Sequence, residues 1–385
     1  MMTTPSPTIA PQTRTRTAPW PNGSILIRGF QTLHPRFRSP QETLQNELIK
    51  AHARSGNVSP KTLRALFDRY SASPEKIAFR GHEAQFLDLD GSDVAKKTAF
   101  FDQAVRAVFE RFYPPLAAAP DSIVHVTCTG YCAPSGAQRL VSLRRWGRQT
   151  QVLHAYHMGC YAAHPAIRMA AALATSSRTR GSVDVVHTEL CSLHMDPTNH
   201  DASQLVIQSL FADGFIKYQL DRTGSDEMGV GTSDAFELIH VRDEIIPESS
   251  DTMGWSIGPL VFNMTLSKEV PPLFALALPR FVSSLMREAG FDWEVEKPGA
   301  IVAIHPGGPL IIEMTERALQ LTPAQVAASR RVLREHGNMS SATLPVIWQN
   351  ILHDARIPDG TLVVSLGAGP GLTLSGALLR KRNAL

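Results

Sequence analysis

Apolar and polar positions along the chain follow two alternating patterns. Short runs rich in Val, Ile, Leu and Phe alternate with longer stretches in which apolar residues recur every three or four positions. The first pattern predicts strands and the second predicts amphipathic helices. Strands are expected at 24–33, 122–130, 151–158, 182–190, 235–241, 261–267, 300–306 and 361–367. Helices are expected at 93–113, 136–146, 159–174, 203–211, 272–289, 308–320 and 341–354.

Pro residues that follow a small polar residue mark further helix starts. Ser39-Pro40 with Glu42 predicts an N-cap, a Pro at the first helical position and a capping box. Ser59-Pro60 and Thr322-Pro323 predict two more helices that begin in the same way. A glycine-rich turn is expected at 367–371, after the last strand.

The alternation of strands and helices predicts an α/β fold. Two stretches of comparable organisation, 23–230 and 231–385, predict a core built from two similar halves, although no sequence repeat is visible. Residues 1–22 are rich in Thr and Pro and lack the apolar segment of a secretory signal. We expect them to form a disordered N-terminal arm.

Composition narrows the class of protein. With 43% hydrophobic and 19% charged residues, the chain is typical of a soluble globular protein. A net charge of +3 is too small to argue for nucleic acid as a partner. The four cysteines, at positions 128, 132, 160 and 191, form no disulfide framework, which favours a cytoplasmic location. No run of 18 apolar residues occurs, so we expect no membrane span.

Cys160 is a candidate nucleophile. It lies where a strand-like segment meets the Ala-rich segment GCYAAHPAIRMAAALA. The positive end of a helix dipole favours a thiolate, so a thiol at a helix N-terminus is reactive. Gly159 permits a tight turn into this helix, and Pro165 fits only in its first turn. The alternative is a buried structural cysteine, which is the commoner role of a free thiol.

His305 and Asn338 are the candidate partners of Cys160. His305 ends an apolar strand, and ligands of α/β sheets bind at that edge. Asn338 lies in HGNMSSA, between two helices, where it either points into a cleft or caps a helix. A Cys beside a His performs acyl transfer, and an Asn can donate to a developing oxyanion. The chain shows no conspicuous pair of acidic residues. A decarboxylative condensation needs none, because loss of carbon dioxide generates the carbanion.

A metal site and a phosphate loop are rival interpretations of two segments. Several His and Cys residues follow one another closely: His154, His157, Cys160, His187, Cys191, His194 and His200. Their spacing matches no common zinc motif, so we expect no metal and no other cofactor. The 367–371 segment lacks the Lys-Ser/Thr of a phosphate loop, and Pro370 removes one amide, so we expect no nucleotide site.

Five motifs, in the expected order, resemble those of the type III polyketide synthases, relatives of the chalcone and stilbene synthases. They are GCYAAHPAIRMA around Cys160, SLFADG at 209–214, IHPGGP around His305, HGNMSSA around Asn338 and GAGPGLTLSGALL at 367–379. The resemblance runs from about Ser24 to the C-terminus. It implies a thiolase-like αβαβα layered fold, a homodimer, and a Cys–His–Asn site reached by a tunnel for the pantetheine arm of coenzyme A.

The resemblance also implies a role for each site residue. Cys160 would hold the starter and the growing chain as a thioester. His305 would stabilise the cysteine thiolate and, with Asn338, would bind the carbonyl of malonyl-CoA and then the enolate. Phe211 resembles a gatekeeper between tunnel and cavity, and Asp213-Gly214 would be structural or would line the cavity.

Three cavity positions depart from the plant enzymes. Tyr161 stands where those enzymes usually have a Phe, and Met264 stands at a second gatekeeper position. His194, preceded by Cys191, takes a position often held by a cavity Thr. The stretch MGWSIGPLVFNMTLSKEVP at 253–271 resembles the bacterial branch that makes alkylpyrones and alkylresorcinols from fatty acyl starters. These features favour an aliphatic starter.

Lys61, Arg64 and Arg69 fall on one predicted helix. They would suit the phosphates of coenzyme A, and they equally fit a solvated charged helix face.

The sequence therefore predicts a homodimeric type III polyketide synthase that uses an acyl-CoA and malonyl-CoA, with an acyl carrier protein as a possible donor of the starter. The first alternative is a single-round β-ketoacyl synthase that releases its product without cyclisation. The second is a metal-dependent hydrolase that uses the His/Cys cluster. A non-catalytic scaffold of the same fold is the third.

Overall fold

The computed structural model describes residues 20, 23–56, 58–85, 91–176, 181–223 and 233–384. The predicted arm at 1–22, apart from Trp20, and the predicted junction at 230 and 231 lie outside these residues. Within the described ranges, one mixed sheet has the strand order β11-β12-β13-β8-β1-β7-β6-β4-β5. Its strands are β1 (Ser24–Leu33), β4 (Ser122–Thr127), β5 (Gln151–Tyr156), β6 (Val183–Glu189), β7 (Gly214–Thr223), β8 (Ala235–Ile245), β11 (Ile301–Ile304), β12 (Leu362–Gly369) and β13 (Thr373–Arg382).

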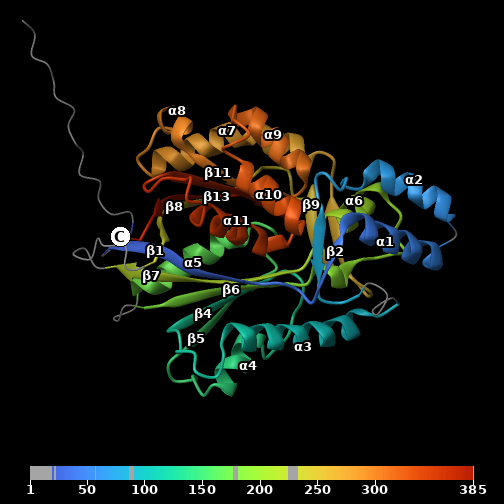
Figure 1. Cartoon of the computed structure of the whole chain (residues 1–385), viewed down its shortest axis with the longest axis horizontal. Helices are drawn as coiled ribbons and strands as arrows, with labels where there is room; N and C mark the ends of the chain where they lie inside the picture. The colour runs from blue at the N-terminus through green and yellow to red at the C-terminus, as the bar shows by residue number, and fades with distance from the viewer. Residues whose placement is uncertain are drawn as a thin grey trace, which may run out of the picture.

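The sheet and its helices form five layers (Figure 1). Helices α5 (Ala163–Ser176) and α11 (Thr343–Leu352) lie between the two ends of the sheet, and α5 contacts strands of both ends. Helices α3 (Val94–Phe112) and α4 (Gly136–Leu143) cover one outer face. Helices α7 (Val270–Glu288) and α9 (Pro309–Leu319) cover the other. This α/β/α/β/α order confirms the predicted thiolase-like fold.

The two ends of the sheet share one pairing scheme. In the first, β4 runs parallel to β6, β6 antiparallel to β7, and β7 antiparallel to β1. In the second, β11 runs parallel to β12, β12 antiparallel to β13, and β13 antiparallel to β8. Strand β1 also pairs antiparallel with β8. The chain therefore has two similar halves that are joined edge to edge by its first strand.

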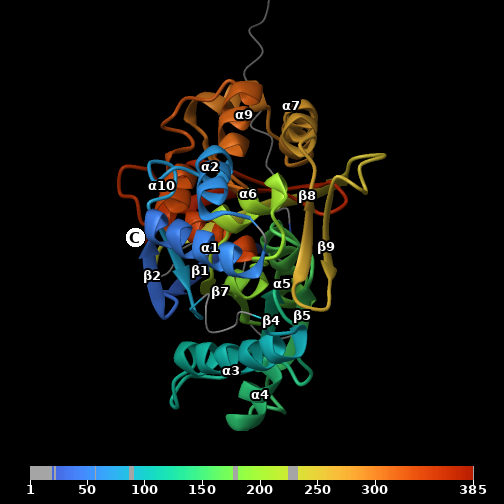
Figure 2. The ribbon, with the colours of Figure 1, turned by 90° about the vertical axis from the view of Figure 1, so that its right-hand side faces the viewer.

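The remaining described elements lie mostly at one end of the layers, as Figure 2 shows for α1, α2, α6 and β9. They are β2 (Phe37–Pro40), β3 (Phe79–His82), β9 (Met253–Ile257), β10 (Phe262–Leu266), α1 (Gln41–Ser55), α2 (Pro60–Tyr70), α6 (Ala202–Leu210), α8 (Trp293–Glu296), α10 (Ala327–His336), and the 3₁₀ helices η1 (Cys191–His194), η2 (Lys297–Gly299) and η3 (Ser340–Ala342). Among the described helices, none has the length and apolar character needed to cross a membrane.

The main hydrophobic core surrounds α5. Five of its six alanines are fully buried, and their small side chains allow strands on both sides to approach the helix closely: Ala163, Ala166, Ala170, Ala171 and Ala174. Trp348 of α11 is the largest fully buried side chain and belongs to the same core. The Ala-rich composition of α5 thus follows from its place between two layers of strands.

Most predicted elements are present, and two predicted helix starts are wrong. Ser59 caps α2 as expected, with Oγ accepting from Thr62 N at 3.1 Å. Ser39 instead belongs to β2, where its Oγ lies 3.0 Å from His82 Nε2, and α1 has no side-chain cap. The helix expected at Thr322-Pro323 begins only at Ala327, because Thr322 forms a local turn with Gln325.

Candidate active site

Cys160 lies in the turn between β5 and α5, three residues before the first residue of the helix. Gly159 has a φ of +84°, and a Cβ at this position would lie 2.4 Å from Pro370 Cδ, so only glycine fits. The Gly159 N–H donates to Cys128 Sγ at 3.1 Å. Pro165 lies in the first turn of α5, as expected. Contacts from Cys128, which directly follows β4, and from the β12–β13 turn therefore fix the backbone that carries the thiol.

The motifs around Cys160, Phe211 and Asn338 meet at Ser340. The Cys160 Sγ lies 3.9 Å from Ser340 Oγ, and the Ser340 N–H donates to Asn338 Oδ1 at 2.9 Å. The backbone of Asn338 also pairs with the Phe211 segment, because Asn338 N donates to Leu210 O and Ala212 N donates to Asn338 O. These bonds bring the loop of Asn338 next to the cysteine.

His305 directly follows β11, and its N–H donates to Leu366 O of β12 at 2.8 Å. Both ring nitrogens of His305 and the Nδ2 of Asn338 are buried, and none has a hydrogen-bond partner among the described residues. Buried polar groups are almost always paired, so unpaired ones call for an explanation. The atoms in question belong to the two residues predicted to bind a carbonyl oxygen, and a bound ligand would satisfy them.

Burial controls the protonation of this site. It raises the pKa of Cys160 to about 12, although a hydrogen bond with Ser340 opposes the shift. It lowers the pKa of His305 to about 3, and nearby His164 acts in the same direction. Burial therefore opposes the thiolate that the helix dipole favours, and it opposes the charged imidazolium of His305 as well.

Glu189, which the sequence analysis missed, is a fully buried carboxyl close to the candidate nucleophile. Its Oε2 accepts from Cys128 N and Thr129 Oγ1, both at 3.0 Å, and its Oε1 accepts from Ser341 Oγ. Burial raises the pKa of Glu189 to about 7, and the hydrogen bonds oppose this shift. The carboxyl in turn raises the pKa of Cys160. The sequence signal that could have identified Glu189 is its position as an acidic residue at the end of an apolar strand.

Residues 237–382 match the family model of the chalcone and stilbene synthases, C-terminal domain. The chain belongs to the chalcone and stilbene synthase superfamily. The sequence motifs therefore identified the family correctly.

This superfamily member is similar to proteins from Dictyostelium and from Streptomyces. It is 30% identical over 260 residues to "Probable polyketide synthase 1" of Dictyostelium discoideum, an alignment that covers 67% of this chain and 8% of that protein. The C-terminal type III polyketide synthase domain of Steely1 from Dictyostelium superposes with a TM-score of 0.80 at 23% identity, covering 94% of this chain and 100% of that one. The 1,3,6,8-tetrahydroxynaphthalene synthase of Streptomyces coelicolor A3(2) gives 0.78 at 22% identity, covering 93% and 100%. The chain thus has the fold of type III polyketide synthases.

In this chalcone and stilbene synthase relative, Cys160 borders a cavity of about 30 Å³. Phe211, Met264 and Cys191, all predicted as cavity residues, line the same space. Trp255, which the sequence analysis missed, also lines it and donates from Nε1 to Cys128 O at 2.6 Å. This volume holds little more than a water molecule, so an acyl chain requires side chains to move. His305 and Asn338 do not line the cavity themselves.

Two predicted cavity residues lie behind the wall of this cavity. Tyr161 packs against the β12–β13 hairpin, since a Cβ on Gly369 would lie 2.2 Å from its ring. His194 stacks on Phe262 with ring centroids 4.2 Å apart, accepts from Phe262 N at 3.1 Å and donates to Thr129 O at 2.8 Å. Both residues support neighbouring elements, and neither borders the space at Cys160.

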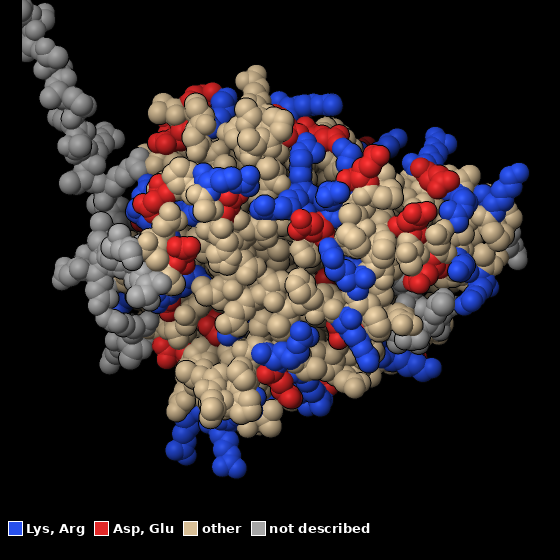
Figure 3. Space-filling model, in the orientation of Figure 1, with Lys and Arg blue, Asp and Glu red and all other residues tan. Residues whose placement is uncertain are grey.

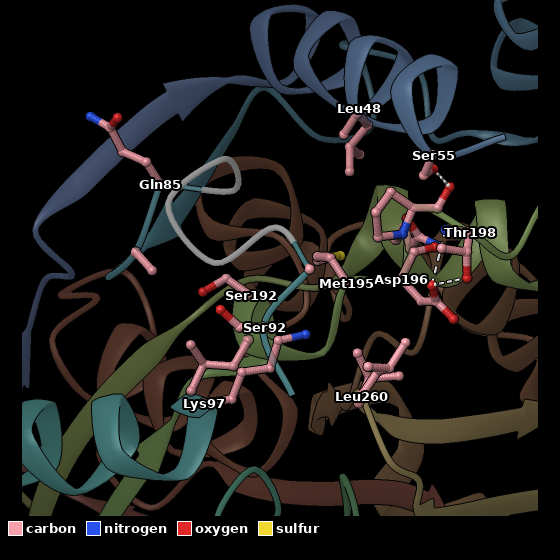
Figure 4. Close-up of a pocket in the computed structure, with 17 residues that line it drawn as sticks. Leu48, Ser55, Gln85, Ser92, Lys97, Ser192, Met195, Asp196, Thr198 and Leu260 are labelled. Atoms are coloured by element: carbon pink, nitrogen blue, oxygen red, sulfur yellow. Dashed lines mark hydrogen bonds between the residues drawn. The ribbon is translucent and has the colours of Figure 1, made fainter. Parts of the chain in front are cut away.

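A second cavity, of about 160 Å³, lies between α1, α3 and η1 (Figure 4). Consecutive residues of η1 line the two spaces: Cys191 lines the one at Cys160, and Ser192 and Leu193 line the other. Leu48, Met195 and Leu260 contribute apolar walls to the second cavity. A single 3₁₀ turn therefore contributes walls to both.

The His and Cys residues of the rival metal interpretation are engaged separately. His154 Nε2 lies 2.9 Å from Ser135 Oγ, and His157 Nε2 lies 2.7 Å from Trp255 O. His187 is hydrogen-bonded to Ser341 and to Tyr218. In the part of the chain that the structure describes, no group of three or more His, Cys, Asp or Glu is arranged to hold a metal ion.

The predicted basic residues lie on the exposed face of α2. Arg64 donates to Asn46 Oδ1 at 2.6 Å, and the Arg69 guanidinium lies 5.3 Å from the ring centre of Tyr70. Lys61 is exposed. Figure 3 shows Lys and Arg interspersed with Asp and Glu over this end of the molecule. A patch of one sign, which would favour phosphates, is not visible on this face.

Proposed function

We propose that the protein is a type III polyketide synthase that condenses an acyl-CoA starter with malonyl-CoA by decarboxylative Claisen condensation. The observation that carries this proposal is the set of buried polar atoms on His305 and Asn338 that have no partner among the described residues, together with the link from Cys160 through Ser340 to Asn338. A nucleophile beside hydrogen-bond donors for a carbonyl oxygen is what acyl transfer and enolate formation require. Membership in the chalcone and stilbene synthase superfamily supports the same chemistry.

The proposed reaction has two stages. Cys160 gives its proton to His305, the thiolate attacks the acyl-CoA carbonyl, and the CoA thiolate leaves and takes up that proton. Malonyl-CoA then binds with its thioester oxygen at His305 and Asn338. Loss of carbon dioxide leaves an enolate on the same donors. Its carbon attacks the Cys160 thioester, a carbon–carbon bond forms, and the Cys160 thiolate is expelled.

The test is to incubate the protein with malonyl-CoA and a panel of acyl-CoA starters of increasing chain length. We expect carbon dioxide release and products that contain the starter extended by two or more ketide units, identified by mass spectrometry. A product extended once and released without cyclisation would instead favour a β-ketoacyl synthase. If no starter gave any carbon–carbon bond formation, the proposal would be wrong.

We propose an aliphatic starter, as the 253–271 segment suggests, and an alkylpyrone or alkylresorcinol product. Met264 lines the cavity at Cys160, and an unbranched Met side chain adapts to a flexible alkyl chain. A homodimer, delivery of the starter by an acyl carrier protein, a cytoplasmic location and the lack of a cofactor are parts of the same proposal. The matched curated relative is far longer than this chain, which aligns with 8% of it.

Met264→Phe is expected to lower the ratio of kcat/KM for a long-chain over a short-chain acyl-CoA. A rigid Phe would block the space that Met can open, whereas loss of a single methylene contact accounts for only about 1–3 kcal/mol. The measurement is this ratio in wild type and variant. Met264→Leu, which conserves volume and apolar character, is the matched control and should keep the ratio. An unchanged ratio in Met264→Phe would mean that Met264 does not contact the starter.

A further inference from the structure

A buried histidine that the sequence analysis did not single out ties α5 to the second half of the molecule. His164 has 0% exposure, its Nδ1 lies 3.1 Å from Ser375 Oγ, and its Nε2 lies 2.8 Å from Ser365 Oγ. Ser365 of β12 and Ser375 of β13 share one face of the sheet, because Ser375 pairs with Gly367, two residues beyond Ser365. One imidazole therefore joins the start of α5 to two neighbouring strands.

The partners of the two serines fix the direction of every hydrogen bond. Trp348 Nε1, which can only donate, donates to Ser365 Oγ at 2.9 Å. Ser375 Oγ donates to the Asp243 carboxylate, so it must accept from His164 Nδ1–H. The Ser365 hydroxyl therefore donates its hydrogen bond to His164 Nε2. Burial lowers the pKa of His164 to about 4, consistent with this neutral tautomer.

This hydrogen-bonded chain touches the three elements that hold the candidate site. His164 follows Cys160 by four residues, within the turn and first turn of α5. Ser365 precedes Leu366, whose carbonyl accepts from the His305 N–H at 2.8 Å. Trp348 lies on α11, the helix that follows the Asn338 loop, and its ring centroid is 5.9 Å from that of His164. Asp243, at the far end, is also paired with Arg168, one turn further along α5.

We propose that His164 is a positioning residue for the condensation, and that its two hydrogen bonds set the separation of Cys160 and His305. This inference rests on the function proposed above. If α5 slid along β12, the Cys160 thiol would move relative to the His305 imidazole. Cys160 lies four residues before His164, and the His305 N–H is bonded to Leu366, the neighbour of Ser365. Misplacement of a reacting group by about 1 Å can cost on the order of 100-fold in rate. His164 itself does not line the cavity at Cys160.

The test compares His164→Leu, which removes both hydrogen bonds, with His164→Gln, whose amide supplies one donor and one acceptor. For each variant, kcat and KM for malonyl-CoA are measured, together with the rate of alkylation of Cys160 by iodoacetamide near neutral pH. We expect His164→Leu to lower kcat on the order of 100-fold with little change in KM. Its alkylation rate should fall about tenfold, which corresponds to one pKa unit of lost thiolate stabilisation. His164→Gln should recover most of both quantities.

His125 provides the matched control. It has 0% exposure and is also bonded to two hydroxyls, Thr188 Oγ1 at 2.9 Å and Tyr156 OH at 2.7 Å. His125→Leu should lose a comparable amount of unfolding free energy and keep kcat within a few-fold. Equal losses of kcat in the two Leu variants, or a His164→Gln variant no better than His164→Leu, would overturn the proposal.

Two further comparisons keep the outcome decisive. If His164→Leu does not fold, Ser375→Ala removes only one of the two bonds and is judged by the same measurements against His125→Leu. If the wild type forms no condensation product with any starter, the proposed function has failed. The alkylation rate of Cys160 still tests His164 in that case, and an unchanged rate in His164→Leu would refute the positioning role.

Discussion

Replacing Cys160 by Ala is expected to abolish the covalent acyl adduct that the wild type forms with an acyl-CoA starter. The Cys128→Ala, Cys132→Ala and Cys191→Ala variants are expected to retain it. Cys128 Sγ is hydrogen-bonded to the backbone of Gly159, as the acceptor of its N–H and as a donor to its carbonyl oxygen. The Cys160 Sγ lies 3.9 Å from Ser340 Oγ, and the Ser340 N–H donates to Asn338 Oδ1, so the Cys160 thiol is linked to the loop of Asn338. Intact-protein mass spectrometry after addition of the starter measures the adduct.

The three other cysteine variants are the controls for this experiment, because each removes a thiol of the same chain. Cys128 and Cys191 line the same cavity as Cys160, so a starter in this cavity would meet all three thiols. Peptide mapping of the wild-type adduct would locate it independently. An adduct that persists in Cys160→Ala would refute the assignment of the nucleophile.

Asn338→Ala is expected to separate the two stages of the reaction. The variant should still accept a starter on Cys160, yet release carbon dioxide from malonyl-CoA more slowly by about 100- to 1,000-fold, the usual cost of removing one oxyanion donor. The reason is that Asn338 Nδ2 is a buried donor without a partner among the described residues. We expect it to bind the thioester oxygen that becomes negative when the enolate forms. Carbon dioxide release and starter loading are measured on the same preparation.

Asn350 supplies a matched control, because its Nδ2 already donates to Val346 O within α11 at 2.9 Å. Asn350→Ala should decarboxylate malonyl-CoA at nearly the wild-type rate. Undiminished carbon dioxide release in Asn338→Ala would contradict the role given to Asn338. Loss of starter loading together with decarboxylation would place its contribution at the first stage instead.

Local sequence patterns predicted most helices and strands, because neighbouring residues determine where most of these elements form. Strand β1 has the predicted bounds, and the Ser59 cap forms as expected. The exceptions depend on distant partners. Strand β13 contains the helix-favouring run ALLRKR, but pairing with β12 and β8 on its two edges overrides that preference. Ser39 does not cap a helix as predicted, because its Oγ is hydrogen-bonded to His82, which is far away in sequence.

The residues of the candidate site that belong to motifs or lie at the ends of strands could be predicted from the sequence. Cys160, His305 and Asn338 were predicted in this way, and Phe211 and Met264 line the cavity at Cys160. Position in a motif does not reveal which way a side chain turns, and Tyr161 and His194 do not line that space. Networks that join strands far apart in sequence, such as those of Glu189 and His164, become visible only in three dimensions.

The double pairing of β1 has a consequence for the order of synthesis. Residues 25–28 of β1 are hydrogen-bonded to β7 on one edge and to β8 on the other. The ribosome makes β1 long before β8, which begins at Ala235, so the second edge of β1 stays open until β8 has emerged. An open strand edge can pair with another chain, so the nascent first half is exposed to misassembly during this interval. For the same reason, the matched segment 237–382, if excised, would present the uncovered edge of β8 to solvent.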